Sequence, residues 1–362
     1  MSKPYCIAPW VSLNTTPTGT APCCSWNDAY NDFDVYRDEY VENVKLKMLN
    51  HDFEFLSKSC RRCIEREKIG EVSDRQNFQR YIETGILKNE TDIGFMDLRF
   101  SNKCNYKCIM CNGWASSSIA KEENLVVPEF YPNSDKFLKL DFNNLRYLKI
   151  LGGEPTIQSQ AFDLLNMLVE KYDASKIIFS YTTNCSTASK KWFDLCNKFK
   201  QVYCEMSIEG TGIVNDYIRS GSKWSKVHNN VCKIVEHSKN TDGQFHTQIH
   251  TVIGLINLAV IYKWLPWFID FKNQYNVEAH FYPLDAVFGG SINALQEKYK
   301  QEVRDYLYTV DHDYARTIIK MIDVPYSKEE FLTFKNHIQN KDKLRKTSIY
   351  DVDPIFEEIM SE

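Results

Sequence analysis

The chain has 362 residues, of which 43% are apolar and 25% charged, and its formal net charge is −4. This composition is typical of a globular protein and includes no basic tail that would bind a nucleic-acid backbone, so nucleic acid is not an indicated partner. The longest apolar runs, such as residues 252–260, are too short to span a membrane, and residues 1–20 lack the pattern of an export signal. We therefore expect a cytoplasmic protein without membrane contact.

Residues 1–70 contain a turn-rich segment from Asn14 to Pro22 and few periodic apolar positions. They also contain five of the twelve cysteines, namely Cys6, Cys23, Cys24, Cys60 and Cys63. In a reducing compartment, grouped cysteines indicate metal ligands rather than disulfides. A segment with so small a core would gain folding free energy from a bound metal. We predict a small metal-binding domain over 1–70 and a polar linker helix over 71–93.

Between residues 94 and 290, strand-like runs alternate with amphipathic helical runs. The six strand-like runs are 95–101, 146–152, 176–183, 202–208, 247–254 and 277–284. The helical runs lie near 160–173, 188–200, 222–238 and 259–274. This alternation predicts an α/β fold of repeated βα units, and six strands are too few for a closed eight-stranded barrel. We expect an open or partial barrel over 94–290, followed by helices over 291–362.

Three cysteines, Cys104, Cys108 and Cys111, follow the first predicted strand of this sheet in the spacing C-x3-C-x2-C. Each iron of a [4Fe-4S] cluster normally binds one thiolate, so three cysteines leave one iron open to another ligand. A structural zinc site would need a fourth Cys or His, which a remote part of the chain would have to supply. The spacing favours the cluster over zinc.

At this motif the chain resembles the radical S-adenosylmethionine (SAM) superfamily, in which the same cysteine spacing follows the first strand of a partial (β/α)6 barrel. Gly152, Gly153 and Glu154 follow the second predicted strand and are similar to the GGE element that contacts the amino group of the SAM methionine. Adjacent glycines let a backbone approach a ligand closely, and a carboxylate pairs with an ammonium group. The resemblance implies a [4Fe-4S] cluster whose open iron binds SAM, which is cleaved to methionine and a 5′-deoxyadenosyl radical that takes a hydrogen from a C–H bond.

Further matches to relatives follow in order along the chain: Asn184, Ser207, Glu209 and Arg219. The resemblance implies that Asn184 lines the SAM site, that Ser207 and Glu209 face the ribose, and that Arg219 reaches the SAM carboxylate. The alternative for Arg219 is a helix cap or a surface pair with Asp216. Asn257, just past the fifth strand, is a candidate for the site or a turn residue. No residue is assigned a catalytic role.

The N-terminal cysteines resemble the auxiliary-cluster modules called SPASM and twitch. Cys6 stands in a C-x-x-P-W motif, Cys23 and Cys24 follow Pro22 after a turn, and the last two cysteines form a C-x2-C pair. Relatives usually place this module after the barrel, whereas here it comes first. The resemblance implies one auxiliary [4Fe-4S] or [2Fe-2S] cluster on Cys6, Cys60, Cys63 and Cys23, with Cys24 as the alternative to Cys23. The rival is a structural zinc with four cysteine ligands.

The resemblance implies a radical SAM enzyme of the oxidoreductase or maturase type that takes electrons from a flavodoxin- or ferredoxin-type reductant. A peptide or protein substrate is favoured, because SPASM and twitch relatives often modify such substrates. Dehydrogenation or rearrangement of a sugar, aminocyclitol or nucleotide is the alternative. Two alternatives are not enzymes: a zinc-binding interaction module and an electron-transfer protein.

Overall fold

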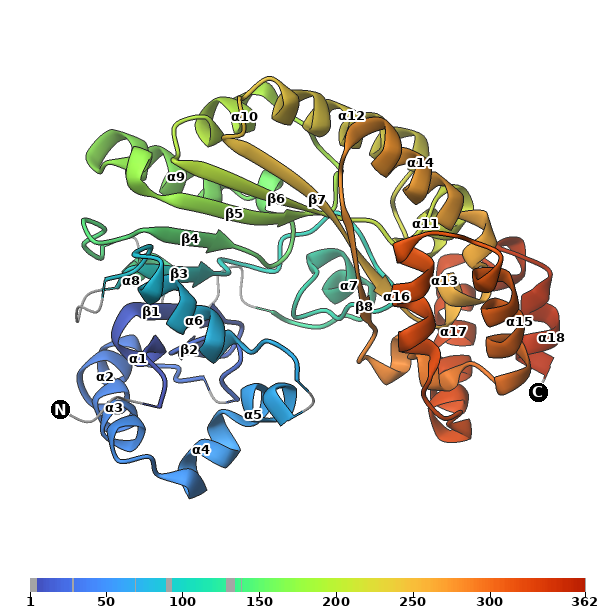
Figure 1. Cartoon of the computed structure of the whole chain (residues 1–362), viewed down its shortest axis with the longest axis horizontal. Helices are drawn as coiled ribbons and strands as arrows, with labels where there is room; N and C mark the ends of the chain where they lie inside the picture. The colour runs from blue at the N-terminus through green and yellow to red at the C-terminus, as the bar shows by residue number, and fades with distance from the viewer. Residues whose placement is uncertain are drawn as a thin grey trace. The chain divides into compact units, whose positions relative to one another are not determined.

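The computed structural model describes residues 5–27, 29–68, 70–88, 93–127, 134–137 and 139–361. Eight strands form a mostly parallel sheet in the order β2-β1-β3-β4-β5-β6-β7-β8, with helices in the connections (Figure 1). This confirms the predicted α/β class with βα units and C-terminal helices. The strands are β1 (Ser12–Thr16), β2 (Gly19–Ala21), β3 (Phe95–Leu98), β4 (Tyr147–Ile150), β5 (Ile178–Thr183), β6 (Gln201–Ser207), β7 (Phe245–Ile253) and β8 (Ala279–Pro283).

Two compact units divide the chain, and each is described by itself. The first contains residues 1–103, 125–182 and 189–203. In it, β2 runs antiparallel to β1, and β1, β3, β4 and β5 pair in parallel. Its helices are α1 (Ala8–Val11), α2 (Phe33–Val35), α3 (Val41–Leu49), α4 (Phe53–Ser59), α5 (Arg61–Lys68), α6 (Asp74–Glu83), α8 (Ser134–Phe137), α9 (Ser159–Lys171) and α10 (Lys190–Cys196), with a π-helical turn at Tyr36–Tyr40 and 3-10 turns at Pro155–Ile157 and Ala174–Lys176.

The first strand, β1, lies where the sequence predicts only turns. Its residues are mostly polar, yet they are buried, because they hydrogen-bond to the residue that follows β3. Asn14 Oδ1 accepts from Arg99 Nη1 at 3.0 Å, and Thr15 Oγ1 accepts from the backbone N–H of Arg99 at 2.5 Å. The N-terminal segment therefore contributes two strands to the sheet.

The predicted linker contains α6, which begins with a capping box between Ser73 and Gln76. Phe78 on this helix packs edge-on against Phe95 of β3 at 5.1 Å between ring centroids. Phe78 also belongs to the N-terminal core, whose other buried members include Val11, Trp26, Met48 and Leu56 together with Cys6 and Cys60. Residues 89–92, at the end of the predicted linker, lie outside the described residues. The domain boundaries at 70, 93 and 290 stay a prediction.

The second unit contains residues 104–124, 183–188 and 204–362. In it, β7 and β8 pair in parallel, with Ile249 opposite Ala279 and Ile253 opposite Pro283. Its helices are α7 (Ser117–Glu122), α11 (Gly212–Ile218), α12 (Trp224–Lys239), α13 (Leu255–Ala259), α14 (Leu265–Tyr275), α15 (Glu297–Tyr308), α16 (Asp313–Ile322), α17 (Lys328–Arg345) and α18 (Ile355–Ser361), with 3-10 turns at Ile261–Lys263, Val287–Gly289, Ile292–Ala294 and Ile349–Asp351.

One face of β7 and β8 is apolar and buried under helices. Phe281 of β8 lies 5.1 Å from the Tyr314 ring of α16 and 6.0 Å from the Phe268 ring of α14. Such burial contributes roughly 1.5–3 kcal/mol for each large side chain. Among the helices of the described ranges, none has the length and apolar composition to cross a bilayer.

Candidate functional site

Cys104, Cys108 and Cys111 lie on the loop that leads into α7, and a run of three serines fixes the start of this loop. Ser116 caps α7 by accepting the Ile119 N–H at 3.3 Å. The backbone N–H of Cys104 donates to Ser117 Oγ at 3.1 Å, and its carbonyl accepts from Ser118 Oγ at 2.8 Å. The first cysteine is therefore anchored to the N-terminal turn of the helix.

The segment that follows α11 fixes the middle of the same loop. The N–H of Lys107 donates to the Ser220 carbonyl at 2.7 Å, and the N–H of Ile109 donates to the Ile218 carbonyl at 2.8 Å. Backbone hydrogen bonds of this kind restrict the loop to one conformation. The loop is thus held on two sides.

The chemistry of the three thiols fits an iron–sulfur cluster. Burial raises the pKa of Cys108 to about 12 and also raises the pKa of Cys111, and the other thiols of the loop raise both further. Thiols with a raised pKa are protonated at neutral pH, and metal ions would supply the positive charge that stabilises their thiolates. Within the described ranges, no three Cys, His, Asp or Glu side chains are arranged around a single ion. In a four-iron cluster each thiolate binds a different iron.

Asn184 lies beside this loop, in the unit that holds the three cysteines. Its Nδ2 donates to Asn105 Oδ1 at 3.0 Å and lies 3.8 Å from Cys104 Sγ. Ser186 Oγ contacts the same Asn105 oxygen at 3.3 Å. The structure therefore brings Asn184 to the first cysteine.

Glu209 and Arg219 form a buried ion pair, with 2.7 Å between Glu209 Oε2 and Arg219 Nη1. Burial raises the pKa of Glu209, while Arg219 opposes this rise. Burial acts against the charge on Arg219, but the Glu209 carboxylate and Cys108 outweigh it and raise the pKa of the guanidinium. Arg219 Nε is buried and has no hydrogen-bond partner among the described residues. The pair therefore leaves one buried donor beside Cys108 for a further acceptor.

The alternative partner of Arg219, Asp216, is used elsewhere. Asp216 accepts from Ser222 Oγ at 2.6 Å and from the Trp224 N–H at 2.9 Å, at the beginning of α12. Ser207, the last residue of β6, is half-buried. The roles of Ser207, Glu209 and Arg219 toward SAM stay predictions.

A mostly apolar pocket adjoins the cysteine loop within the second unit. Its lining residues are Ile109, Met110, Ile218, Val252, Gly254, Ile256, Asn257, Leu284 and Gly289. Asn257 shapes this pocket, because its Nδ2 donates to the carbonyls of Glu209 at 3.0 Å and Val252 at 2.8 Å. The cavity has a volume of about 10 Å³, which is room for one water molecule, so these residues form a nearly closed apolar wall beside the loop.

The Gly152-Gly153-Glu154 turn lies in the first unit. Both glycines have left-handed φ angles, +76° and +55°, and a Cβ atom at Gly153 would lie 2.3 Å from the Lys103 carbonyl oxygen. Glu154 is buried, and its Oε1 accepts from Thr156 Oγ1 at 2.6 Å and from the Thr156 N–H at 3.2 Å. Glycine is therefore required by the close approach of two backbone segments, and Glu154 is held in a fixed orientation.

Four of the N-terminal cysteines line one pocket in the first unit: Cys6, Cys23, Cys60 and Cys63. Burial raises the pKa of Cys6 and of Cys60 to about 12, and in each case a neighbouring thiol adds to the effect. Burial likewise raises the pKa of Cys23 well above its ordinary value, with Cys6 as the next cause. Four cysteine thiols are the donor set of a cluster or of a structural zinc, although among the described residues no three such side chains are arranged to share a single ion.

Cys24 differs from these four. It is exposed, and its Sγ contacts Asp74 Oδ2 at 3.6 Å. Cys23 and Cys24 are adjacent in sequence, so the sequence alone does not separate them. In the structure Cys23 lines the pocket with the other three thiols, and the choice of Cys23 over Cys24 as a ligand stays a prediction.

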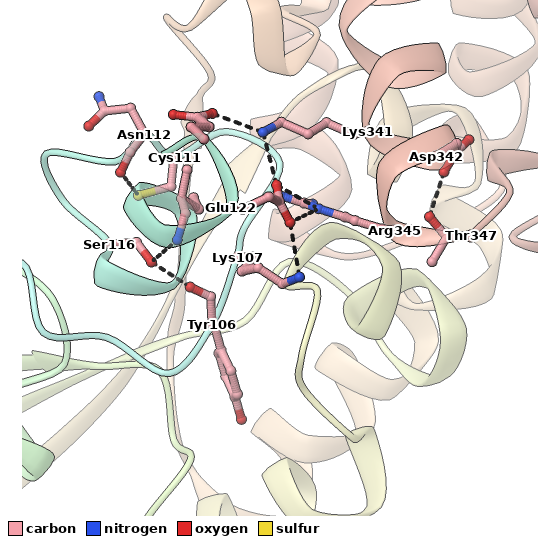
Figure 2. A network of polar contacts seen from close by, with 12 residues as sticks. Tyr106, Lys107, Cys111, Asn112, Ser116, Glu122, Lys341, Asp342, Arg345 and Thr347 are labelled. Atoms are coloured by element: carbon pink, nitrogen blue, oxygen red, sulfur yellow. Dashed lines mark hydrogen bonds and ion pairs between the residues drawn. The ribbon is translucent and has the colours of Figure 1, made fainter. Parts of the chain in front are cut away.

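Sequence reasoning missed a group of charged residues that contact the cysteine loop and α7, shown in Figure 2. These residues are Lys107, Glu122, Glu123, Lys341 and Arg345. The contacts that Lys341 and Arg345 make with Glu122 join residues more than 200 positions apart, which no local pattern reveals. The only available signal was the four-residue spacing of His337, Lys341 and Arg345, which places them on one helical face.

Residues 98–255 match the family model described as Radical SAM superfamily, over somewhat less than half of the chain. These residues therefore form a radical SAM domain, which indicates an enzyme that uses SAM and an iron–sulfur cluster. A search of curated proteins returns no match to the chain.

Two solved structures with similar folds are those of native anSMEcpe with bound AdoMet and of Streptococcus suis SuiB bound to precursor peptide SuiA. The first has 17% identity and a TM-score of 0.43, and the match covers 70% of this chain and 67% of that chain. The second has 17% identity and a TM-score of 0.40, and the match covers 72% of this chain and 60% of that chain. At this distance the likeness says nothing about substrate or partners.

Proposed function

We propose that the protein is a radical SAM enzyme whose SAM-binding [4Fe-4S] cluster is held by Cys104, Cys108 and Cys111. The observation that carries the proposal is the loop described above, which holds three cysteines and is fixed by hydrogen bonds to α7 and to residues 218–220 inside the matched domain. When bound, the cluster supplies the electron that cleaves SAM to methionine and a 5′-deoxyadenosyl radical, which abstracts hydrogen from a substrate C–H bond.

The residues around the loop would bind and orient SAM. Arg219 keeps a buried Nε donor beside Cys108, and an anionic group such as the SAM carboxylate would satisfy it. Met110 and Asn257 belong to the nearly closed wall beside the loop, which would exclude water from bound SAM. By its resemblance to the GGE element, Glu154, which Thr156 orients within the first unit, would bind the methionine ammonium. Asn184 holds the Cys104 end of the loop.

Cleavage of SAM tests this proposal without any knowledge of the substrate. The protein, isolated and reconstituted without oxygen, should be brown, absorb visible light and release 5′-deoxyadenosine from SAM when a strong reductant is added. Cys104→Ala should abolish this release. A colourless, zinc-containing protein would instead be an interaction module, and a protein with clusters but no 5′-deoxyadenosine would be an electron carrier.

We also propose an auxiliary iron–sulfur cluster on Cys6, Cys23, Cys60 and Cys63, which places the protein with SPASM- and twitch-type oxidoreductases or maturases. The convergence of these thiols on one pocket supports the ligand set. Iron and sulfide analysis of Cys60→Ala tests it, because loss of one of two clusters removes about half of the iron while SAM cleavage continues. Full iron content in that variant would contradict the second cluster.

For the substrate we propose a peptide or protein, modified in the cytoplasm with electrons from a flavodoxin- or ferredoxin-type donor. A sugar, aminocyclitol or nucleotide is the other candidate. Deuterium-labelled candidates from both groups, incubated anaerobically with the enzyme, distinguish them: the substrate transfers deuterium to 5′-deoxyadenosine, as read by mass spectrometry. If deuterium reaches 5′-deoxyadenosine from a labelled sugar but not from a labelled peptide, the peptide proposal is rejected.

A further inference from the structure

Helix α17 presents three residues in a row to the cysteine loop and α7: His337, Lys341 and Arg345. Their spacing of four places them on one face of the helix. His337 lies near the backbone of Ile109, between the second and third cysteines, and its Nε2 is buried without a hydrogen-bond partner among the described residues. Lys341 Nζ lies 3.0 Å from a Glu122 oxygen and 2.9 Å from a Glu123 oxygen, and Arg345 Nη2 lies 2.8 Å from Glu122 (Figure 2).

The ion-pair group is closed to solvent at its centre. The side chains of Glu122 and Arg345 are only 6% and 4% exposed. Lys107 from the loop also reaches Glu122, at 2.9 Å, so two carboxylates face three cations. Replacing buried ion pairs by apolar side chains of similar volume often leaves the free energy of unfolding unchanged or higher. Ion pairs differ from apolar contacts in that they hold the paired side chains in one relative orientation. The group therefore fits a role in positioning better than a role in stability alone.

The same charges lie next to the cluster ligands. Lys107 immediately precedes Cys108 in sequence. Glu123 follows the last residue of α7 and forms an ion pair with Lys341 at 2.9 Å, and Lys107 of the cysteine loop forms one with Glu122 at 2.9 Å. Lys341 is the ion-pair partner that compensates Glu123. Because net charge near an iron–sulfur cluster tunes its reduction potential, Lys341 lies where it would affect that potential.

We propose that Lys341 and Arg345 are positioning residues for the SAM-binding cluster: through Glu122 and its ion pair with Lys107 they fix the loop that carries Cys108 and Cys111, and Lys341 offsets the negative charge of Glu123 at the end of α7. This inference rests on the proposed function. It gives the C-terminal helix, in which the sequence shows no chemistry, a part in the site.

Hydrogen exchange of the full-length protein tests the positioning directly and requires no substrate. In Lys341→Met, the amides of residues 104–124 should exchange about tenfold faster than in the wild type, because buried carboxylates lose a partner. Lys341→Arg keeps the charge and should restore protection. Lys343→Met is the matched control, since Lys343 is exposed on the same helix and should leave these amides unchanged.

A redox titration of the reconstituted protein tests the charge. The cluster that binds SAM is identified by the change of its electron paramagnetic resonance signal when SAM is added. Lys341→Met should make the midpoint potential of this cluster more negative, and Glu123→Gln should make it more positive. In the double variant Lys341→Met/Glu123→Gln, the midpoint potential should return toward the wild-type value. This variant also serves as a control in case a single variant is misfolded.

Shifts of the midpoint potential in opposite directions in the two single variants, with recovery in the double variant, would support the proposal. Loss of a purely structural contact would not be expected to shift the potential in opposite directions in Lys341→Met and Glu123→Gln. Unchanged amide exchange in Lys341→Met would overturn the positioning role, and a potential equal to the wild type would overturn the charge role. A wild-type protein without any cluster signal would reject the proposed function instead, while the exchange experiment would still report on the loop.

Discussion

Replacing Glu122 by glutamine should destabilise the protein by about 3 kcal/mol at neutral pH. Burial by itself would raise the pKa of Glu122, but hydrogen bonds from Arg345, Lys107 and Lys341 outweigh burial and lower it to about 2, from an ordinary value of 4.5. Glutamine keeps the shape of the side chain and removes the charge that the three cations bind. The variant therefore resembles the wild type with this carboxyl protonated.

The pH dependence follows from the sign of this shift. The folded-state pKa lies below the unfolded-state value, so the charge of Glu122 stabilises the protein fully above pH 4.5, and this contribution is lost as the pH falls through about 2. At about 1.4 kcal/mol per pKa unit, the difference between wild type and variant should be about 3 kcal/mol at pH 7 and about 1.5 kcal/mol at pH 3.

Urea unfolding, followed by circular dichroism at pH 7, 5, 4 and 3, measures this difference. Glu302→Gln serves as the control, because Glu302 is an exposed carboxylate on α15 and its loss should change stability by less than about 0.5 kcal/mol. A loss below about 1 kcal/mol for Glu122→Gln at pH 7, or one that does not shrink toward pH 3, would refute the reasoning.

Three further outcomes are expected. Arg219→Met should lower the free energy of unfolding, measured in urea, by about 3–5 kcal/mol, because it leaves Glu209 buried without its cation. The double variant Arg219→Met/Glu209→Gln should recover most of this loss, and equal stabilities of the single and double variants would contradict the expectation. Gly153→Ala should lower the melting temperature, since its Cβ would meet the Lys103 carbonyl at 2.3 Å, and an unchanged melting temperature would argue against this turn geometry. Cys23→Ser should remove about half of the bound iron whereas Cys24→Ser should remove none, and the reverse result would exchange their assignments.

Six of the eight strands could be predicted from the sequence, because each is an apolar run rich in β-branched or aromatic residues. β1 could not, since its side chains are polar and become buried only when Asn14 and Thr15 hydrogen-bond to Arg99, 84 or more positions away. The short helices α11 and α13 were also missed, because five to seven residues carry no clear period.

The cysteine spacing identifies the candidate site because thiol chemistry and local spacing are both visible in a sequence. The partners of Glu209 and Glu122 are not visible, because the chain must fold before a carboxylate meets its cation. For the same reason the sequence offered Asp216 as a partner for Arg219, whereas in the structure Arg219 pairs with Glu209 and Asp216 lies at the start of α12. Local patterns thus report which groups are present, and tertiary packing decides how they pair.

The parallel pairing of β1 with β3 limits how this protein can be altered by deletion or transplantation. Ser12, Leu13 and Asn14 lie opposite Phe95, Met96 and Asp97, so the cysteine-rich N-terminal segment supplies the neighbour of β3. Removing that segment would make β3 an exposed edge strand, whose free backbone N–H and C=O groups can pair with strands of other molecules. The segment is therefore not an independent module. If it were transferred to another protein, that protein would need a sheet with an unpaired edge strand that can pair with β1 as β3 does.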